Sequence, residues 1–213
     1  MELEYERNMI VKYGKKLIEC DLTTGTGGNL SILNKDKNLV AISPSGIDYH
    51  DITADDVVIV NREGEIIEGD RKPSSEINMH LIIYNNRPEI NSVIHTHSIY
   101  ATTVASINKE LPAVHYMIAV AGKKVPCAKY ASFGTEEIAN EAINSLGSKY
   151  KATLLSNHGL LSIGKDISEA FNIAEEIEFV SEIYYRSKSI GKPVIISDEE
   201  MNNMQEAFKT YGQ

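Results

Sequence analysis

The chain opens with the apolar spacing of an amphipathic helix. Met9, Ile10, Tyr13 and Leu17 recur at intervals that share one helix face, which predicts a helix over residues 3–20. Later helices are predicted where a capping side chain precedes apolar positions. These helices begin near Ser74, Thr135, Asp166 and Ser197, and one more covers residues 101–107.

Short apolar or alternating runs between these helices predict β-strands. The strands cover residues 30–33, 39–42, 57–60, 65–67, 92–97 and 152–155, and the last is expected to end at His158. Hairpins come first, and strands alternate with helices later in the chain. This order predicts one α/β or α+β layered domain over residues 1–213, built on a mixed sheet.

Composition narrows the class of function. The 213 residues are 42% hydrophobic and 24% charged, which is typical of a globular protein. A net charge of -9, with scattered Lys and Arg, argues against a nucleic acid or an anionic membrane as partner. Two cysteines are too few for a disulfide framework, and the N-terminus is acidic where a signal peptide is basic. A cytoplasmic location is therefore expected.

Two histidines separated by one residue end a predicted strand. His95 and His97 would share one face, with backbones about 6.6 Å apart, so both rings could reach one cation. His158 after a second strand and Glu76 at a helix start would complete the ligand set of a catalytic zinc site. The alternatives are a solvated strand face for the histidines and a helix-dipole role for Glu76. His50, His80 and His115 lack ligand spacing.

A glycine-rich turn precedes the first predicted strand. Gly25-Thr26-Gly27-Gly28-Asn29 follows a helix and leads into a strand, which is the reverse of the dinucleotide-binding order. We expect instead backbone N–H groups that can hold a phosphate, together with Ser45-Gly46 and Ser74-Ser75. A plain turn is the alternative for each loop.

The motifs together resemble the class II zinc-dependent sugar-phosphate aldolases. The resemblance spans the chain and rests on the glycine-rich turn, Pro73-Ser74-Ser75-Glu76, His95-Thr96-His97, residues 115–119, residues 126–135, Asn157-His158-Gly159-Leu160 and residues 208–212. It implies a three-layer α/β/α fold around a largely antiparallel sheet. It also implies a homotetramer with its active sites near subunit interfaces.

The resemblance assigns roles to individual residues. It implies one Zn²⁺ per subunit held by His95, His97 and His158, with Glu76 as the catalytic acid/base and a further zinc ligand when no substrate is bound. The implied phosphate set is Asn29, Ser45, Gly46, Ser74 and Ser75, with Thr26 and Gly27 nearby. Tyr116 and Phe133 are expected on the aldehyde side, and Tyr211 is expected to reach a neighbouring subunit's site, so the catalytic set is Glu76, Tyr116 and Tyr211.

The implied reaction is the reversible cleavage of L-fuculose 1-phosphate into dihydroxyacetone phosphate and L-lactaldehyde. Another deoxyketose 1-phosphate would react through the same residues. L-ribulose-5-phosphate 4-epimerases and methylthioribulose-phosphate dehydratases are alternatives. The epimerase pattern, however, has an aspartate where this chain has Glu76. Adducin-like interaction modules share the fold and lack the zinc histidines.

Overall fold

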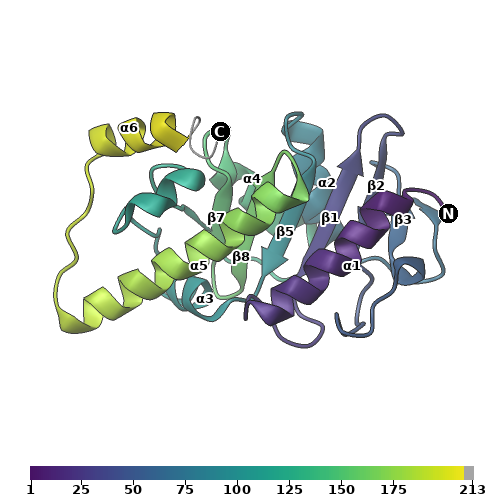
Figure 1. Ribbon diagram of the computed structural model, residues 1–213, viewed down its shortest axis with the longest axis horizontal. Helices are drawn as coiled ribbons and strands as arrows, with labels where there is room; N and C mark the ends of the chain where they lie inside the picture. Colours follow the sequence, from purple (N-terminus) through teal and green to yellow (C-terminus); the bar gives the residue numbers. More distant parts are fainter. Residues whose placement is uncertain (209–213) are drawn as a thin grey trace.

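Eight strands form one mixed sheet in the computed structural model, which describes residues 1–208 (Figure 1). Their order across the sheet is β4-β3-β2-β1-β5-β8-β7-β6. All neighbours are antiparallel except β6 and β7, which are parallel. The strands are β1 (Asn29–Asn34), β2 (Leu39–Ile42), β3 (Val58–Val60), β4 (Ile66–Glu68), β5 (Ser92–Thr96), β6 (Cys127–Ala128), β7 (Ala152–Leu155) and β8 (Gly159–Gly164).

Helices cover both faces of this sheet. They are α1 (Glu4–Glu19), α2 (Ile77–Asn86), α3 (Ile99–Ser106), α4 (Glu136–Leu146), α5 (Ile167–Ile190) and α6 (Asp198–Phe208), with short 3-10 turns η1 (Ala54–Asp56) and η2 (Tyr116–Val120). In Figure 1, α1 and α5 cross the near face and α2 and α4 lie behind the sheet. Among the described residues, no helix combines the length and the apolar character needed to cross a lipid bilayer.

Alternating side chains of the central strand feed two separate cores. Ile94 packs in the core with α1, α3 and α5, whereas Val93 packs in the core with α2 and α4. This is the expected outcome for a strand buried on both sides, because successive side chains point to opposite faces. The predicted three-layer α/β/α architecture around a largely antiparallel mixed sheet is confirmed.

Local capping explains where the helices begin. Thr135 and Asp166 accept hydrogen bonds from backbone N–H groups three residues later, at 3.4 and 2.8 Å. The helix α2 begins later than the predicted start near Ser74. Ser74 Oγ accepts the N–H of Glu76 at 3.3 Å, but the helix begins at Ile77, so Glu76 occupies the N-cap rather than the first turn.

The prediction of a strand that ends at His158 missed a hairpin. The β7 strand stops at Leu155, and a tight turn leads directly into β8. Asn157 takes a left-handed conformation with φ of 55°, which asparagine tolerates better than most residues. His158 therefore lies in the turn at the end of the hairpin, where its ring is free to face the neighbouring strand.

The register of the central strands gathers residues that are distant in sequence. Asn29 on β1 pairs with His95 on β5, and His95 pairs in turn with Leu161 on β8. Gly28, just before β1, has φ of +69°, and a Cβ added there would lie 2.6 Å from the His95 carbonyl oxygen. The backbone of the glycine-rich turn therefore packs directly against the histidine strand.

Replacement of Gly28 by alanine should destabilise the protein more than the same change at Gly25. Both glycines have positive φ, but a Cβ on Gly25 meets nothing within 4 Å. We expect Gly25→Ala to lower the free energy of unfolding by about 1 kcal/mol through backbone strain. Gly28→Ala adds overpacking against His95, about 1 to 3 kcal/mol more. Urea unfolding of both variants measures this difference, and equal losses would contradict the close packing.

Candidate metal centre and substrate pocket

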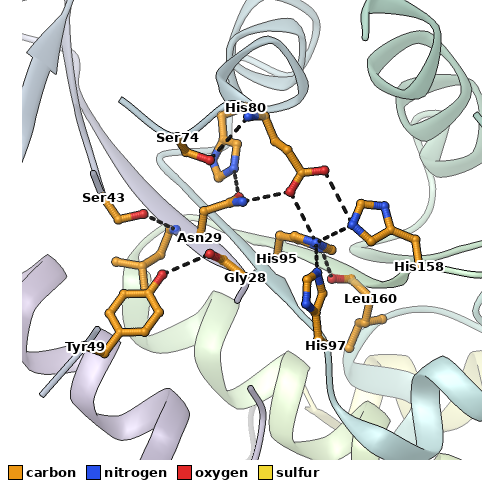
Figure 2. A network of polar contacts seen from close by, with 12 residues as sticks. Gly28, Asn29, Ser43, Tyr49, Ser74, His80, His95, His97, His158 and Leu160 are labelled. Atoms are coloured by element: carbon orange, nitrogen blue, oxygen red, sulfur yellow. Dashed lines mark hydrogen bonds and ion pairs between the residues drawn. The ribbon is translucent and has the colours of Figure 1, made fainter. Parts of the chain in front are cut away.

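Three histidine rings converge on one point at the end of the central strands (Figure 2). His95 is on β5, His97 follows that strand, and His158 lies in the turn between β7 and β8. The Nε2 atom of His95 is 2.9 Å from Nε2 of His97 and 3.3 Å from Nε2 of His158. The structure thus brings together the three predicted metal ligands.

Hydrogen bonding sets the tautomer of His95. Its Nδ1 is 2.9 Å from the carbonyl oxygen of Leu160, so Nδ1–H donates and the lone pair is on Nε2. Burial, followed by the neighbouring His158 and His97 rings, lowers the pKa of His95 well below its usual value. Burial also lowers the pKa of His97. Both rings are therefore held neutral, the form that binds a metal.

Glu76 adds a carboxylate to the three rings. Its Oε2 is 3.4 Å from Nε2 of His95, and its Oε1 is 3.5 Å from Nε2 of His158. Oε1 is buried and accepts no hydrogen bond from any described residue. A buried acceptor without a donor is costly, as are imidazole lone pairs that face one another.

A divalent cation fits this donor set. Tetrahedral zinc with bonds of 2.0 to 2.1 Å separates its nitrogen ligands by about 3.3 Å, close to the spacing of the His95 and His158 nitrogens. Such an ion would also satisfy the carboxylate of Glu76. His95, His97 and His158 can therefore bind a metal, with Glu76 as a fourth ligand.

A cavity of about 340 Å³ opens beside this cluster. All eight residues predicted to bind phosphate or substrate line it, together with Glu76, His97 and His158. Those eight are Thr26, Gly27, Asn29, Ser45, Gly46, Ser74, Ser75 and Phe133.

Glu76 is the only acidic side chain among the described residues that line the cavity. None of the described residues that line it is Lys or Arg. An anion would therefore be held by hydroxyls, such as those of Ser45 and Ser75, and by backbone N–H groups. Gly46, with φ of +73°, gives its loop a conformation in which successive N–H groups can point at one anion.

Tyr116, a predicted catalytic residue, does not line this cavity within one chain. Tyr116 is 47% exposed on η2, lines a separate cavity beside α5 and α6, and stacks on Phe208 with ring centroids 6.2 Å apart. Tyr211 lies outside the described residues.

The sequence analysis overlooked His80. It lacks ligand spacing, yet it is fully buried, and its Nε2 is 2.5 Å from Oδ1 of Asn29. The signal that could have found it is its position four residues after Glu76, because residues four apart at a helix start lie on the same side. Tyr130 and Asn157 also line the cavity and were not singled out.

Comparison with known proteins agrees with this geometry. Residues 8–185 match the family described as Class II Aldolase and Adducin N-terminal domain. The chain is 53% identical to 5-deoxy-D-ribulose 1-phosphate aldolase of Bacillus thuringiensis serovar kurstaki, over all of both chains. It is 38% identical to L-fuculose phosphate aldolase of Escherichia coli K12, over 100% of this chain and 98% of that one.

A solved structure titled L-fuculose 1-phosphate aldolase superposes with a TM-score of 0.94. It is 49% identical in sequence and covers 96% of each chain. This structure, the family match and the named relatives are all class II aldolases or aldolases by name. The chain therefore belongs to the class II aldolase family and is an aldolase, a lyase.

Proposed function

We propose that this chain catalyses the reversible, metal-dependent aldol cleavage of a deoxyketose 1-phosphate into dihydroxyacetone phosphate and a short aldehyde. One observation carries the proposal. The three-histidine cluster and Glu76 open onto the same cavity as the hydroxyl and glycine loops. A substrate anchored by its phosphate in those loops would extend its reacting carbons toward the cluster, so much of the catalysis would come from orientation.

The names of the relatives reduce the choice of substrate to two candidates. The first candidate is 5-deoxy-D-ribulose 1-phosphate, the substrate in the name of the relative with 53% identity. L-fuculose 1-phosphate, which the sequence analysis placed first, becomes the second candidate because its named relative is 38% identical. Both are ketose 1-phosphates that would release the same triose phosphate. They differ in the aldehyde, acetaldehyde from the first and L-lactaldehyde from the second.

The proposed metal site consists of His95, His97 and His158, with Glu76 as a ligand before substrate binds. A bound zinc-type ion would supply Lewis acidity for the negative charge that develops on the substrate's carbonyl oxygen when C3–C4 breaks. Glu76, ionised in the free enzyme, would take up a proton from solvent when substrate binds and give it to C3 to complete dihydroxyacetone phosphate, and in condensation it would remove that proton. No lysine Schiff base is needed for this route.

The hydroxyl proton at C4 must leave as the aldehyde forms. We propose that the hydroxyl of a tyrosine of a neighbouring subunit, either Tyr116 or Tyr211, relays it to solvent, in a homotetramer with its sites near subunit interfaces. Two exposed aromatic side chains support this proposal, because Phe133 at the cavity rim is 71% exposed and Tyr116, apart from the cavity, is 47% exposed. Aromatic residues of this kind are enriched in protein interfaces.

The zinc-loaded enzyme should release dihydroxyacetone phosphate from 5-deoxy-D-ribulose 1-phosphate. L-fuculose 1-phosphate and L-ribulose 5-phosphate are the parallel substrates. A chelator should abolish the release and added zinc should restore it. Glu76→Gln should lower kcat about 100-fold or more, whereas Glu63→Gln, at an exposed glutamate, should leave it unchanged. Epimerised pentulose phosphate without triose, or an unchanged kcat for Glu76→Gln, would overturn the proposal.

Two inactive variants should restore one another if Tyr116 acts across a subunit interface. Chains with Glu76→Gln and chains with Tyr116→Phe each lack one side of the site. Random co-assembly in a ring would give about a quarter of sites with both sides intact. We expect the co-expressed mixture to recover activity approaching that fraction. A Glu76→Gln and His97→Ala pair is the control, because both residues come from one chain and no site is repaired. Absence of recovery in mixed oligomers would exclude the shared site.

A further inference from the structure

A buried row of polar side chains leads from the cavity wall into the layer between the sheet and α2. Asn29 Nδ2 lies 2.9 Å from Oε2 of Glu76, and Asn29 Oδ1 lies 2.5 Å from Nε2 of His80. His80 Nδ1 is 2.7 Å from the hydroxyl of Ser31, which is 2.7 Å from the hydroxyl of Tyr84. All five side chains are buried. Figure 2 shows Asn29 between His80 and the histidine cluster.

The direction of every hydrogen bond in this row follows from the carboxylate. An ionised Glu76 only accepts, so the amide nitrogen of Asn29 must face it and the amide oxygen must face His80. His80 Nε2–H therefore donates to that oxygen. Burial lowers the pKa of His80 to about 3, so the ring is neutral and its Nδ1 must accept the Ser31 hydroxyl proton. The Ser31 oxygen then accepts from Tyr84.

We infer that His80 is a positioning residue that fixes Glu76 by holding the Asn29 amide in the orientation that donates to the carboxylate. An asparagine side chain has nearly the same shape after a half-turn of its amide. Glu76 selects the orientation in which the amide nitrogen faces the carboxylate, and the His80 Nε2–H holds the amide oxygen in that orientation. Without a donor at His80, the Asn29 amide would be held at one end only and would no longer keep Glu76 in one position.

The consequence concerns the reacting end of the site. With Oε2 held by Asn29, the Glu76 carboxylate points at the Nε2 atoms of His95 and His158. Outer hydrogen-bond partners of this kind change metal affinity or activity by about 10- to 100-fold. The row also engages both groups of the Asn29 amide, which the sequence analysis assigned to phosphate. We therefore expect loss of the His80 contact to lower kcat rather than to raise KM. This inference rests on the proposed role of Glu76.

Four variants of the full-length enzyme separate positioning from general destabilisation. His80→Leu removes the donor to Asn29. His80→Gln keeps an N–H for Asn29 and an oxygen for Ser31. Ser31→Ala acts on the same row one residue further out, and it carries the test if His80→Leu does not fold. Ser162→Ala is the matched control, because Ser162 is equally buried in the sheet but donates to the Ala170 carbonyl, outside the row.

Two kinds of readout are needed, kinetics with the ketose 1-phosphate and binding of Co²⁺ without substrate. We expect His80→Leu to lower kcat about tenfold or more, to leave KM within about twofold, and to weaken Co²⁺ binding and change its absorption spectrum. His80→Gln should restore most of each property, Ser31→Ala should shift them in the same direction as His80→Leu, and Ser162→Ala should match the wild type.

Equal losses in His80→Leu and His80→Gln would overturn the inference. So would the same losses in Ser162→Ala, or a raised KM with unchanged kcat. If the wild type cleaves no ketose 1-phosphate, the proposed function fails while Co²⁺ affinity and spectrum still decide the role of His80. The inference then stands only if both are altered in His80→Leu and recovered in His80→Gln.

Discussion

The register of three antiparallel strands, β1, β5 and β8, is the constraint on which the site depends. It pairs Asn29 with His95 and His95 with Leu161, so three distant parts of the chain meet at one end of the sheet. A shift by one residue would turn His95 toward the opposite helix layer. The two cores oppose such a shift, because Val93 and Ile94 are each buried on their own side of the strand.

Burial gives this arrangement its chemical character. His95 and His80 lie beneath the cavity with no exposed surface, and each buried polar atom left unpaired costs about 1 to 3 kcal/mol. His95 donates to the Leu160 carbonyl through one nitrogen, and an ion in the proposed metal site would satisfy the other. His80 meets it with Ser31 and Asn29. Fully paired groups of this kind hold a single geometry, which suits the proposed role of presenting donors to a metal and a carboxylate to a carbon.

Much of the fold and of the candidate site could be predicted from the sequence, for physical reasons. His95 and His97 share a strand period, and the capping residue Asp166 marks a helix start, so local pattern was enough for both. The β8 strand was missed because its turn holds Asn157 in place of a glycine. Burial of His80 depends on packing between α2 and the sheet, and the setting of Tyr116 depends on packing against α6. Neither the burial of His80 nor the setting of Tyr116 can be predicted from a local sequence pattern.

The central claim is that His95, His97 and His158 bind one zinc ion per chain, and metal content tests it most directly. The purified full-length chain is loaded with zinc, dialysed and measured by plasma mass spectrometry. The account predicts one zinc per chain in the wild type, near-complete loss in His158→Ala, and full content in His50→Ala, at an exposed histidine outside the cluster. A wild type that retains no zinc, or a His158→Ala variant that keeps it, would contradict the account.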